Sequence, residues 1–222
     1  MKNVSTKTVA KATKKKVEPE LQSNSKSSSI NRTEVGARLR TRRKALGLTL
    51  KDLARDSGVT LSTISKAELG EIGLTYDKFG ALAKALKLDF SDLFGHPDDD
   101  IALEAVHTTS GNEVFYDTDC YRYGLIAADR PNKRMTPVRA IIKARKTTDF
   151  SEYIRHEGEE YVYVLRGSVR LLFETGASYD LALGDSLYFN SAIGHIYLST
   201  GKGHAELLGV CLGSSPPEGG VI

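Results

Sequence analysis

The 222-residue sequence contains no tryptophan and only two cysteines, Cys120 and Cys211. The two cysteines lie outside any spacing typical of a zinc site, a redox pair or a disulfide framework. We interpret them as small, buried hydrophobic residues in a reducing compartment. No apolar run reaches the roughly 20 residues of a membrane-spanning helix, and no signal-peptide core follows the basic N-terminus. The sequence therefore predicts a soluble, cytoplasmic protein without a membrane partner.

The chain as a whole also lacks a large excess of either charge, because its formal net charge is only +3. The charges are unevenly distributed, however. Residues 1–33 hold eight Lys or Arg against two acidic residues, residues 34–95 hold eleven against eight, and residues 96–222 hold twelve against eighteen. A basic first part followed by an acidic second part is typical of a nucleic-acid-binding domain joined to a domain of another kind.

Composition divides the chain into four segments. Residues 1–30 are rich in Lys and Ser and have too few apolar residues to form a core, so they are predicted to be a disordered basic arm. The arm would be either a solvated leader or a segment that follows DNA phosphates, and the sequence leaves its role open. A helical domain is expected over residues 31–95, a linker over 96–104, and a strand-rich domain over 105–222.

The stretch from Gly47 to Gly70 is typical of two short helices joined by a tight turn. Thr49 and Thr60 are suitable N-cap residues, and Asp52 follows Thr49 at the spacing of a capping box. Gly58 is suited to end the first helix in the left-handed conformation. The second helix has an apolar face and a face with hydroxyl groups and a lysine, which suits the major groove of DNA. Its apolar members are Ile64, Ala67 and Leu69.

Three more helices are predicted around this pair. Residues 34–46 combine the apolar side chains of Val35, Leu39 and Leu46 with five cations, some of which are expected to anchor phosphates. Tyr76–Leu86 have apolar residues at helical spacing. A short fifth helix, which Asp89 caps, is predicted to contain Leu88, Phe90, Leu93 and Phe94.

The helical domain resembles the DNA-binding domain of the phage-repressor-like, or XRE, helix-turn-helix regulators, from about Val35 to Phe94. The residues that carry the resemblance are Gly47-Leu48-Thr49, Leu53-Ala54, Ser57-Gly58-Val59, Ser62-Thr63-Ile64-Ser65 and Glu68-Leu69-Gly70. It implies binding to double-stranded operator DNA and an ion pair between Arg43 and Glu68. The candidate DNA contacts are Arg42, Thr49, Thr60, Leu61, Ser62, Thr63, Ser65 and Lys66.

Residues 105–222 change to short strand-like runs separated by turn residues, which favours an antiparallel sandwich or barrel. Gly167-Ser168 between two of these runs predicts a hairpin turn. The predicted strands are Glu113–Tyr116, Tyr121–Ala127, Thr136–Lys143, Glu160–Leu165, Val169–Glu174, Ser186–Phe189, Ile196–Leu198 and Glu206–Leu212.

Two segments of this region resemble the motifs of the cupin family, whose fold is an all-β jelly-roll or double-stranded β-helix. His156-Glu157-Gly158-Glu159-Glu160 and the following Tyr163–Val169 are similar to the first motif. Gly184–Phe189 and the later Gly194-His195 are similar to the second. The resemblance implies an α+β chain of two domains, an all-α five-helix domain and an all-β cupin domain, that dimerises and senses a small-molecule effector.

The cupin resemblance also implies a pattern of metal ligands. Three of its four members fall on His156, Glu160 and His195, and one falls on Ile154, which cannot bind a metal. Two imidazoles and one carboxylate are sufficient for zinc, iron(II) or manganese, so a divalent metal cofactor stays open beside a metal-free pocket. The effector pocket is expected to contain His156, Glu160, Tyr163, Tyr188 and His195.

These resemblances predict a homodimeric, non-enzymatic transcriptional regulator whose cupin domain modulates operator binding. Two alternatives stay open: a cupin domain that only dimerises, and a metal-dependent cupin enzyme tethered to DNA. The sequence gives neither the operator, the effector nor the sign of regulation.

Overall fold

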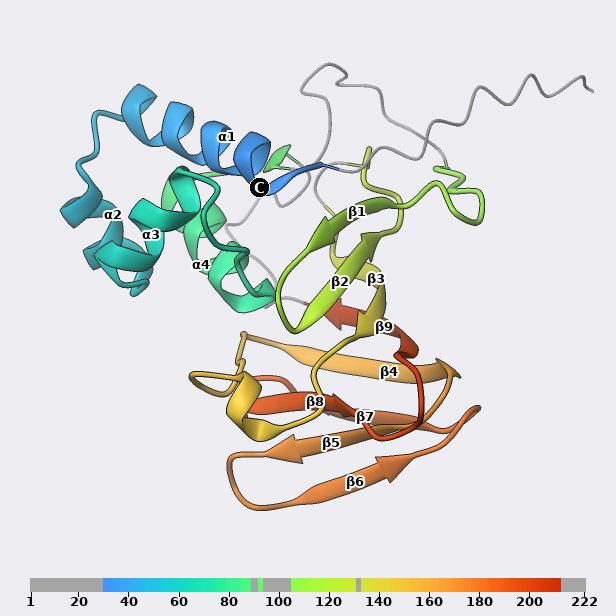
Figure 1. Cartoon of the computed structure of the whole chain (residues 1–222). Helices are drawn as coiled ribbons and strands as arrows, with labels where there is room; N and C mark the ends of the chain where they lie inside the picture. The colour runs from blue at the N-terminus through green and yellow to red at the C-terminus, as the bar shows by residue number, and fades with distance from the viewer. Residues whose placement is uncertain (1–29, 89–91, 94–104, 131–132, 213–222) are drawn as a thin grey trace, which may run out of the picture.

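The computed structural model describes residues 30–88, 92–93, 105–130 and 133–212. Within this part of the chain four α-helices precede nine β-strands, and the helices lie beside β1, β2 and β3 (Figure 1). Nearly all of the predicted basic arm, most of the predicted linker and most of the predicted fifth helix lie outside the described residues. The described part of the helical domain thus has four helices instead of the predicted five, and none of its helices is long and apolar enough to cross a membrane.

The helices begin where the sequence offers capping side chains. Asn31 and Thr49 each accept a hydrogen bond from the backbone N–H three residues later and complete a capping box, and Thr60 accepts from the Thr63 N–H. Gly58 ends the second helix with a φ of 72°, a left-handed conformation that glycine adopts at little steric cost. The helices are Arg32–Ala45 (α1), Leu50–Ser57 (α2), Leu61–Glu68 (α3) and Tyr76–Leu86 (α4).

The helices pack around an apolar core in which α1 and α3 approach each other closely. A Cβ atom on Gly36 would lie 2.2 Å from the Ala67 carbonyl oxygen, so a larger residue at this position would force the two helices apart. Leu46 and Leu69 were expected on apolar helix faces, but they are 36% and 53% exposed because they are the C-cap residues of α1 and α3. The core contains Val35, Leu39, Leu53, Ile64, Phe79, Leu82, Ala83 and Leu86.

The nine strands form two antiparallel sheets. The larger has the strand order β1-β2-β3-β9-β4-β7, and the smaller has the order β6-β5-β8. Eight strands overlap the predicted ones, whereas β6 escapes prediction because only its last residue, Leu181, is buried. The strands are Val114–Asp117 (β1), Tyr121–Leu125 (β2), Met135–Ile142 (β3), Glu159–Arg166 (β4), Val169–Phe173 (β5), Ser178–Leu181 (β6), Ser186–Asn190 (β7), His195–Ser199 (β8) and Ala205–Leu212 (β9).

The predicted hairpin at Gly167-Ser168 is wrong. β4 pairs with β7 and β9, whereas β5 pairs with β6 and β8, so the chain passes from one sheet to the other at this turn. Gly167 has a φ of 75°, which permits the sharp change of direction. Val164 and Val169, on either side of the turn, belong to the same apolar core, so the change of sheet keeps both of them buried.

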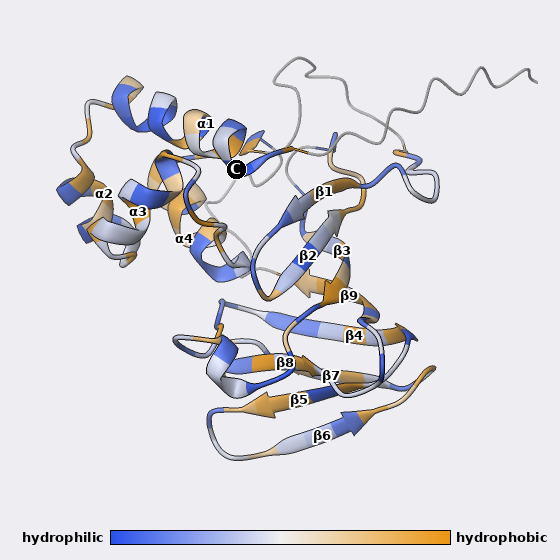
Figure 2. Cartoon of the chain, in the orientation of Figure 1, coloured by the Kyte–Doolittle hydropathy of each residue, from blue (hydrophilic) through white to orange (hydrophobic). Residues whose placement is uncertain are grey.

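Two apolar clusters stabilise the described chain. One belongs to the strand region and includes Val162, Leu171 and Leu207. The other begins in the helices and continues into Tyr116 of β1 and Val138 of β3. Figure 2 shows β9 in largely hydrophobic colours in the middle of the strands, whereas α1 and α2 carry many hydrophilic residues. The helices and strands β1 to β3 therefore share a core, and the linker is not their only connection.

Candidate nucleic-acid interface and inner cavity

One face of α3 is exposed along its first two turns. Leu61 is 41% exposed, Ser62 and Lys66 are exposed, and Thr63 and Ser65 are partly buried. These side chains offer hydroxyl groups, an ammonium group and an apolar contact, which are the groups that read base edges and thymine methyls in a major groove. The five residues lie on a face that is open to a partner, and their contact with DNA stays a prediction.

Thr49 and Thr60 lie at the N-termini of α2 and α3 and have structural partners there. Thr49 Oγ1 donates to Asp52 Oδ2 at 2.6 Å, and Thr60 Oγ1 lies 2.8 Å from Thr63 Oγ1. Both threonines are nevertheless exposed. Because the N-terminus of a helix presents free N–H groups and the positive end of the helix dipole, these two positions suit DNA phosphates.

Arg42, another predicted DNA contact, has hydrogen-bond partners within the helical domain. Its Nε donates to the Leu86 carbonyl at 3.0 Å, and one of its terminal nitrogens donates to the Lys87 carbonyl at 3.2 Å. These bonds satisfy carbonyl groups at the C-terminal end of α4. Arg42 therefore fastens α1 to α4 in this structure, while Arg40 and Lys44 are the exposed cations of α1.

The ion pair between Arg43 and Glu68 is present. Arg43 Nε lies 2.6 Å from Glu68 Oε1, and a terminal nitrogen of Arg43 lies 2.8 Å from Glu68 Oε2. The two side chains are only 10% and 5% exposed. Arg43 also donates to the Leu48 carbonyl at 2.8 Å, so this bidentate pair joins α1, the loop before α2 and the end of the exposed helix α3.

The strand region contains a cavity where β4 and β9 lie side by side. Glu160 of β4 and Cys211 of β9 are directly opposite each other in the antiparallel pairing, and both are buried. Residues in such opposite positions project from the same face of a sheet. His156, from the segment before β4, and His195, from the start of β8, line the same cavity.

The Glu160 carboxylate is the centre of the polar contacts in this cavity. Its Oε2 lies 3.0 Å from His156 Nε2 and 3.3 Å from His195 Nε2, and its Oε1 accepts a hydrogen bond from the Tyr197 hydroxyl at 2.7 Å. Burial alone would raise the pKa of Glu160, but the hydrogen bonds from the two histidines outweigh burial and lower the pKa to about 2. Glu160 is therefore ionised at neutral pH.

The Cys211 thiol and the Tyr197 hydroxyl, which also lie beside Glu160, are neutral. Burial raises the pKa of the Cys211 thiol well above its ordinary value. Burial and the nearby Glu160 carboxylate do the same for the pKa of the Tyr197 hydroxyl. Both groups therefore keep their protons at neutral pH.

The cavity is small, with a volume of about 50 Å³. Because one water molecule needs roughly 10–15 Å³ by this measure, the cavity has room for a few waters or for an ion and its water ligands. Its walls are formed mainly by apolar and aromatic side chains from β2, β3, β4, β8 and β9, including Tyr121, Tyr123, Val138, Ala140, Ile142, Tyr197 and Leu207.

Two predicted pocket residues lie elsewhere. Tyr163 and Tyr188 are 38% and 61% exposed and do not line the cavity. Tyr163 alternates along β4 with the buried residues Val162 and Val164, so its side chain projects from the other face of the sheet. The structure brings together only His156, Glu160 and His195 of the five predicted pocket residues.

The polar lining of the cavity fits a divalent cation. The ligand atoms of His156, Glu160 and Cys211 all lie within 4.8 Å of one another. His195 Nδ1 lies 2.9 Å from the Ile193 carbonyl, and this kind of outer contact orients the other ring nitrogen of a metal-binding histidine. Imidazole, carboxylate and thiolate groups are the ligands of zinc and similar cations, and such a cation would supply a Lewis acid at this point.

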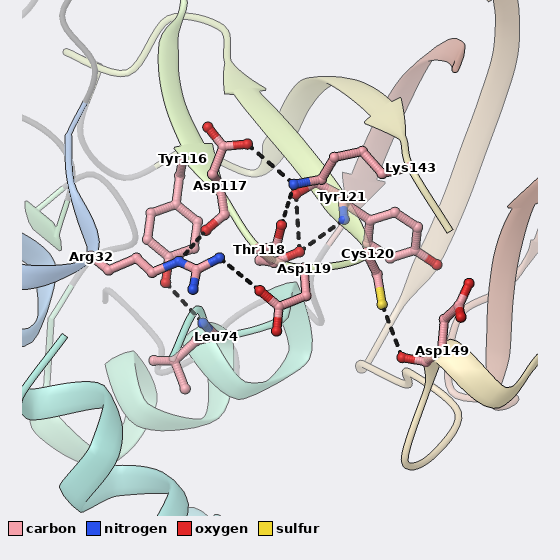
Figure 3. A network of polar contacts seen from close by, with 10 residues as sticks. All are labelled: Arg32, Leu74, Tyr116, Asp117, Thr118, Asp119, Cys120, Tyr121, Lys143 and Asp149. Carbon is pink, nitrogen blue, oxygen red and sulfur yellow. Dashed lines mark hydrogen bonds and ion pairs between the residues drawn. The ribbon is translucent and has the colours of Figure 1, made fainter. Parts of the chain in front are cut away.

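The helical domain contacts the strand region directly. The Leu74 N–H donates to the Tyr116 hydroxyl at 2.8 Å (Figure 3). Arg32 of α1 donates to the Asp117 carbonyl and to the Asp119 carboxylate, each at 2.9 Å (Figure 3). Together with the shared apolar cluster, these bonds hold the start of α1 and the segment before α4 against β1 and the turn that follows it.

Tyr76, the first residue of α4, reaches the cavity from the helical domain. Its ring meets the His156 ring edge-on, with the centroids 4.9 Å apart. Its side chain lines the cavity together with Cys211, which is opposite Thr136 in the pairing of β3 with β9. Tyr76 and His156 also line an open cleft of about 470 Å³ beside α2, α4 and residues 155–157. The two rings therefore stand between the small cavity and the cleft.

Comparison with known families matches both regions. A helix-turn-helix family model matches residues 39–93, and a cupin domain model matches residues 145–211. The chain therefore contains a helix-turn-helix domain of the XRE type and a cupin domain. The exposed helix α3 is the second helix of the matched helix-turn-helix, and the cavity residues His156, Glu160, His195 and Cys211 all lie within the matched cupin domain.

Known proteins that resemble this chain include the HTH-type transcriptional regulator PuuR of Escherichia coli (strain K12), which is 27% identical over 173 residues, or 78% of this chain and 91% of PuuR. An HTH_3 family transcriptional regulator from Vibrio cholerae has a similar fold, with a TM-score of 0.56 and 20% identity over 83% of this chain and 97% of that one. Hydroxypropylphosphonic acid epoxidase from S. wedmorenis aligns with a TM-score of only 0.44 and 22% identity, over 83% of this chain and 100% of that one.

Cys211 and Tyr76 are among the cavity residues that sequence reasoning missed. Cys211 was interpreted as a small hydrophobic residue because neither cysteine has a metal-ligand spacing, and Tyr76 was interpreted only as the start of a helix. Alternation along β9 would have turned Cys211 to the same face as Ala205 and Leu207, but the strand pairing that sets it opposite Glu160 has no local signal.

Proposed function

We propose that the regulator is a homodimer that binds an operator through α3 and whose cupin domain senses a small effector that modulates this binding. The observation that carries the proposal is the position of Tyr76. This residue belongs to α4 of the DNA-binding domain and lines the cavity of the cupin domain. A change in the occupancy of the cavity therefore acts on a side chain of the DNA-binding domain without an intermediate element.

The proposed reading of DNA depends on the exposed face of α3. Ser62, Lys66 and Leu61 would contact base edges, and the N-termini of α2 and α3 at Thr49 and Thr60 would contact phosphates. The buried ion pair between Arg43 and Glu68 supports this arrangement because it fixes the end of α3 to α1.

The proposed dimer uses the outer face of the larger sheet. Tyr161 and Tyr188 are direct neighbours across β4 and β7, Tyr163 lies on the same face, and all three are exposed. Two recognition helices are needed for a two-fold operator, and a face of exposed tyrosines is suited to an interface with a second copy. The two tyrosines predicted for the effector pocket, Tyr163 and Tyr188, would thus serve the dimer instead.

The effector acts by binding one arrangement of the domains more tightly than the other, because equal affinity for both would shift nothing. The usual size of such coupling is about 1–3 kcal/mol, or about 5–150-fold in operator affinity. The shared core of the helices and β1 to β3 supports direct coupling of this kind, since the domains cannot move apart without exposing apolar residues.

The test begins with selection of an operator from random duplex DNA with the full chain. The double variant Ser62→Ala with Lys66→Ala should then lose affinity for the selected operator, whereas Glu71→Ala, an exposed change outside α3, should not. Equal binding by the double variant and the parent would contradict the proposed recognition face. A parent protein that is a monomer at all concentrations would contradict the proposed dimer.

Each of the two other functions left open by the sequence predicts a different experimental result. A regulator with a purely dimerising cupin domain would show operator affinity that no compound or ion alters. A metal-dependent enzyme is favoured by one observation, the set of His156, Glu160 and His195 around the cavity, and it would show metal-dependent turnover of an organic substrate. A turnover screen with the metal-loaded protein separates this candidate from the regulator.

A further inference from the structure

Cys211 lines a cavity in which the cupin pattern has lost one of its ligands. The first histidine of that pattern falls on Ile154, which lines the cavity and offers no donor atom. Cys211 enters the same cavity from β9, opposite Glu160, and its sulfur lies within 4.8 Å of a donor atom of His156 and of Glu160. The cavity thus contains a sulfur donor in addition to the imidazole and carboxylate donors.

We propose that the effector is a divalent transition-metal ion and that Cys211 binds it as a thiolate beside His156 and Glu160. In this proposal, Tyr76 transmits the movement of these ligands on metal binding to the DNA-binding domain. The link to DNA rests on the proposed function, whereas the metal site does not depend on it.

The size of the cavity favours an ion over an organic effector. A volume of about 50 Å³ is small for an organic molecule, but it admits a cation that replaces water. The donor types narrow the choice of cation. A thiolate with an imidazole and a carboxylate favours zinc, cobalt(II) or iron(II), whereas magnesium, calcium and manganese prefer sites made of oxygen atoms.

The binding step needs no oxidant or reductant. The Cys211 thiol would lose its proton to solvent, and its sulfur would form a bond to the cation beside the Glu160 carboxylate. His156 binds through the ring nitrogen that now faces Glu160 at 3.0 Å. His195, which is 3.3 Å from the same carboxylate oxygen, is positioned to bind the cation or to hold Glu160 in place.

Tyr76 is the residue through which the site reaches α4. Its ring contacts the His156 ring, and its side chain lines the same cavity as Cys211, so Tyr76 lies beside two of the proposed ligands. The segment before α4 is itself fixed to β1 by the bond from the Leu74 N–H to Tyr116. When Cys211 and His156 turn toward a cation, Tyr76 loses or changes its contact with the His156 ring, and the shift enters α4 at its first residue.

The metal site is tested by titrating the metal-free full chain with cobalt(II). The parent should bind one equivalent and show the near-ultraviolet charge-transfer absorption of a cobalt–thiolate bond. Cys211→Ser should lose this absorption and bind roughly tenfold or more weakly. The matched control, Cys120→Ser, should keep it, and these two cysteines are the only sulfur donors of the thiol type in the sequence. Absorption that is missing from the parent, or that persists in Cys211→Ser, overturns the proposal.

If the Cys211→Ser variant does not fold, a measurement on the parent protein can still test the proposal. The X-ray absorption spectrum of the zinc-loaded full chain should show one sulfur at about 2.3 Å and nitrogen or oxygen atoms at about 2.0–2.2 Å. A zinc shell without sulfur overturns the role of Cys211 without any variant.

The role of Tyr76 is tested by comparing operator affinity with and without zinc. Tyr76→Phe should still show the cobalt–thiolate absorption, but zinc should no longer change its operator affinity. Tyr179→Phe, at an exposed tyrosine of β6, should respond like the parent. A zinc response that survives in Tyr76→Phe overturns this role. If the parent binds cobalt through Cys211 but zinc does not change its operator affinity, the coupling between the metal site and DNA binding is refuted, whereas the metal site itself is supported. If the parent does not bind cobalt but an organic compound changes its operator affinity, the metal site is refuted, whereas the proposed function is supported.

Discussion

The recognition helix and the cupin cavity are built in opposite ways. Every residue of the exposed face of α3 lies within two helical turns, and its caps, its glycine turn and its apolar face are local features. The cavity instead combines residues from β4, β8, β9 and the helix α4, which meet only because of strand pairing and domain packing. The α3 site is therefore set by local sequence and lies on the surface, whereas the cavity depends on how distant elements are packed.

We expect the largest loss of stability when the ion pair that attaches α3 to α1 is removed, and this change tests how far the recognition helix depends on a buried contact. Glu68→Ala leaves the buried Arg43 guanidinium without its carboxylate, and breaking a buried ion pair costs about 3–5 kcal/mol. Chemical denaturation should show this loss, and operator affinity should fall with it. Glu71→Ala, an exposed neighbour, is the control. Unchanged stability of Glu68→Ala would mean that the pair contributes nothing to the fold.

The cavity is expected to respond to acid in a way that the surface of α3 does not. Because the pKa of Glu160 is lowered to about 2 in the folded protein, its ionised form stabilises the fold at neutral pH, and this contribution is lost as the pH falls from its ordinary pKa of 4.5 through 2. The expected contribution is about 3 kcal/mol.

This acid response is measured by the free energy of unfolding between pH 7 and pH 2. Glu160→Gln should lose less stability over this range than the parent, since it has no carboxylate to protonate. Glu159→Gln, an exposed change on the same strand, should keep the parent's pH dependence. The pKa assignment is refuted by identical curves for Glu160→Gln and the parent.

The surface of α3 should show an effect on DNA without an effect on stability. Lys66→Ala should reduce discrimination at one base position by about 1–3 kcal/mol if the lysine reads a base, and should weaken binding to all sequences alike if it contacts a phosphate. Titration of a set of operator variants distinguishes these two results. A Lys66→Ala protein that is as specific and as tight as the parent would remove this residue from the interface.

We expect the smallest change in the free energy of unfolding when the exposed ion pair between the helical domain and the strand region is removed. The bond between Arg32 and Asp119 joins a side chain that is 30% exposed to one that is 86% exposed, and such pairs contribute about 0–1 kcal/mol. Asp119→Ala should therefore change the free energy of unfolding by less than about 1 kcal/mol. Tyr116→Phe, which removes the buried partner of the Leu74 N–H, should cost more, at about 1–3 kcal/mol. The reverse order would show that the domains are held by surface charge.

The same contrast explains what the sequence could predict. The caps at Thr49 and Thr60, the left-handed Gly58 and the bounds of α4 follow from neighbouring residues and agree with the structure. The ion pair of Arg43 with Glu68 was predicted from family resemblance and is present. Most strands were predicted because apolar and β-branched residues mark them, and β6 was missed because it has little apolar character.

What the sequence could not give depends on contacts between distant segments. Arg42 was taken as a phosphate contact because its bonds to the carbonyls at the end of α4 have no local signal. Tyr163 and Tyr188 were placed in the pocket from their position near the cupin motifs, although strand alternation turns them outward. Cys211 and Tyr76 enter the cavity only through the pairing of β9 with β4 and the docking of α4.

The central claim is that the cavity and the recognition helix are linked through α4. Its most direct test is the affinity of the full chain for zinc, measured with and without saturating operator DNA. Because coupling between two sites is reciprocal, operator DNA should change the zinc affinity by the same factor by which zinc changes the operator affinity, about 5–150-fold. Zinc binding that is the same with and without operator would contradict the account.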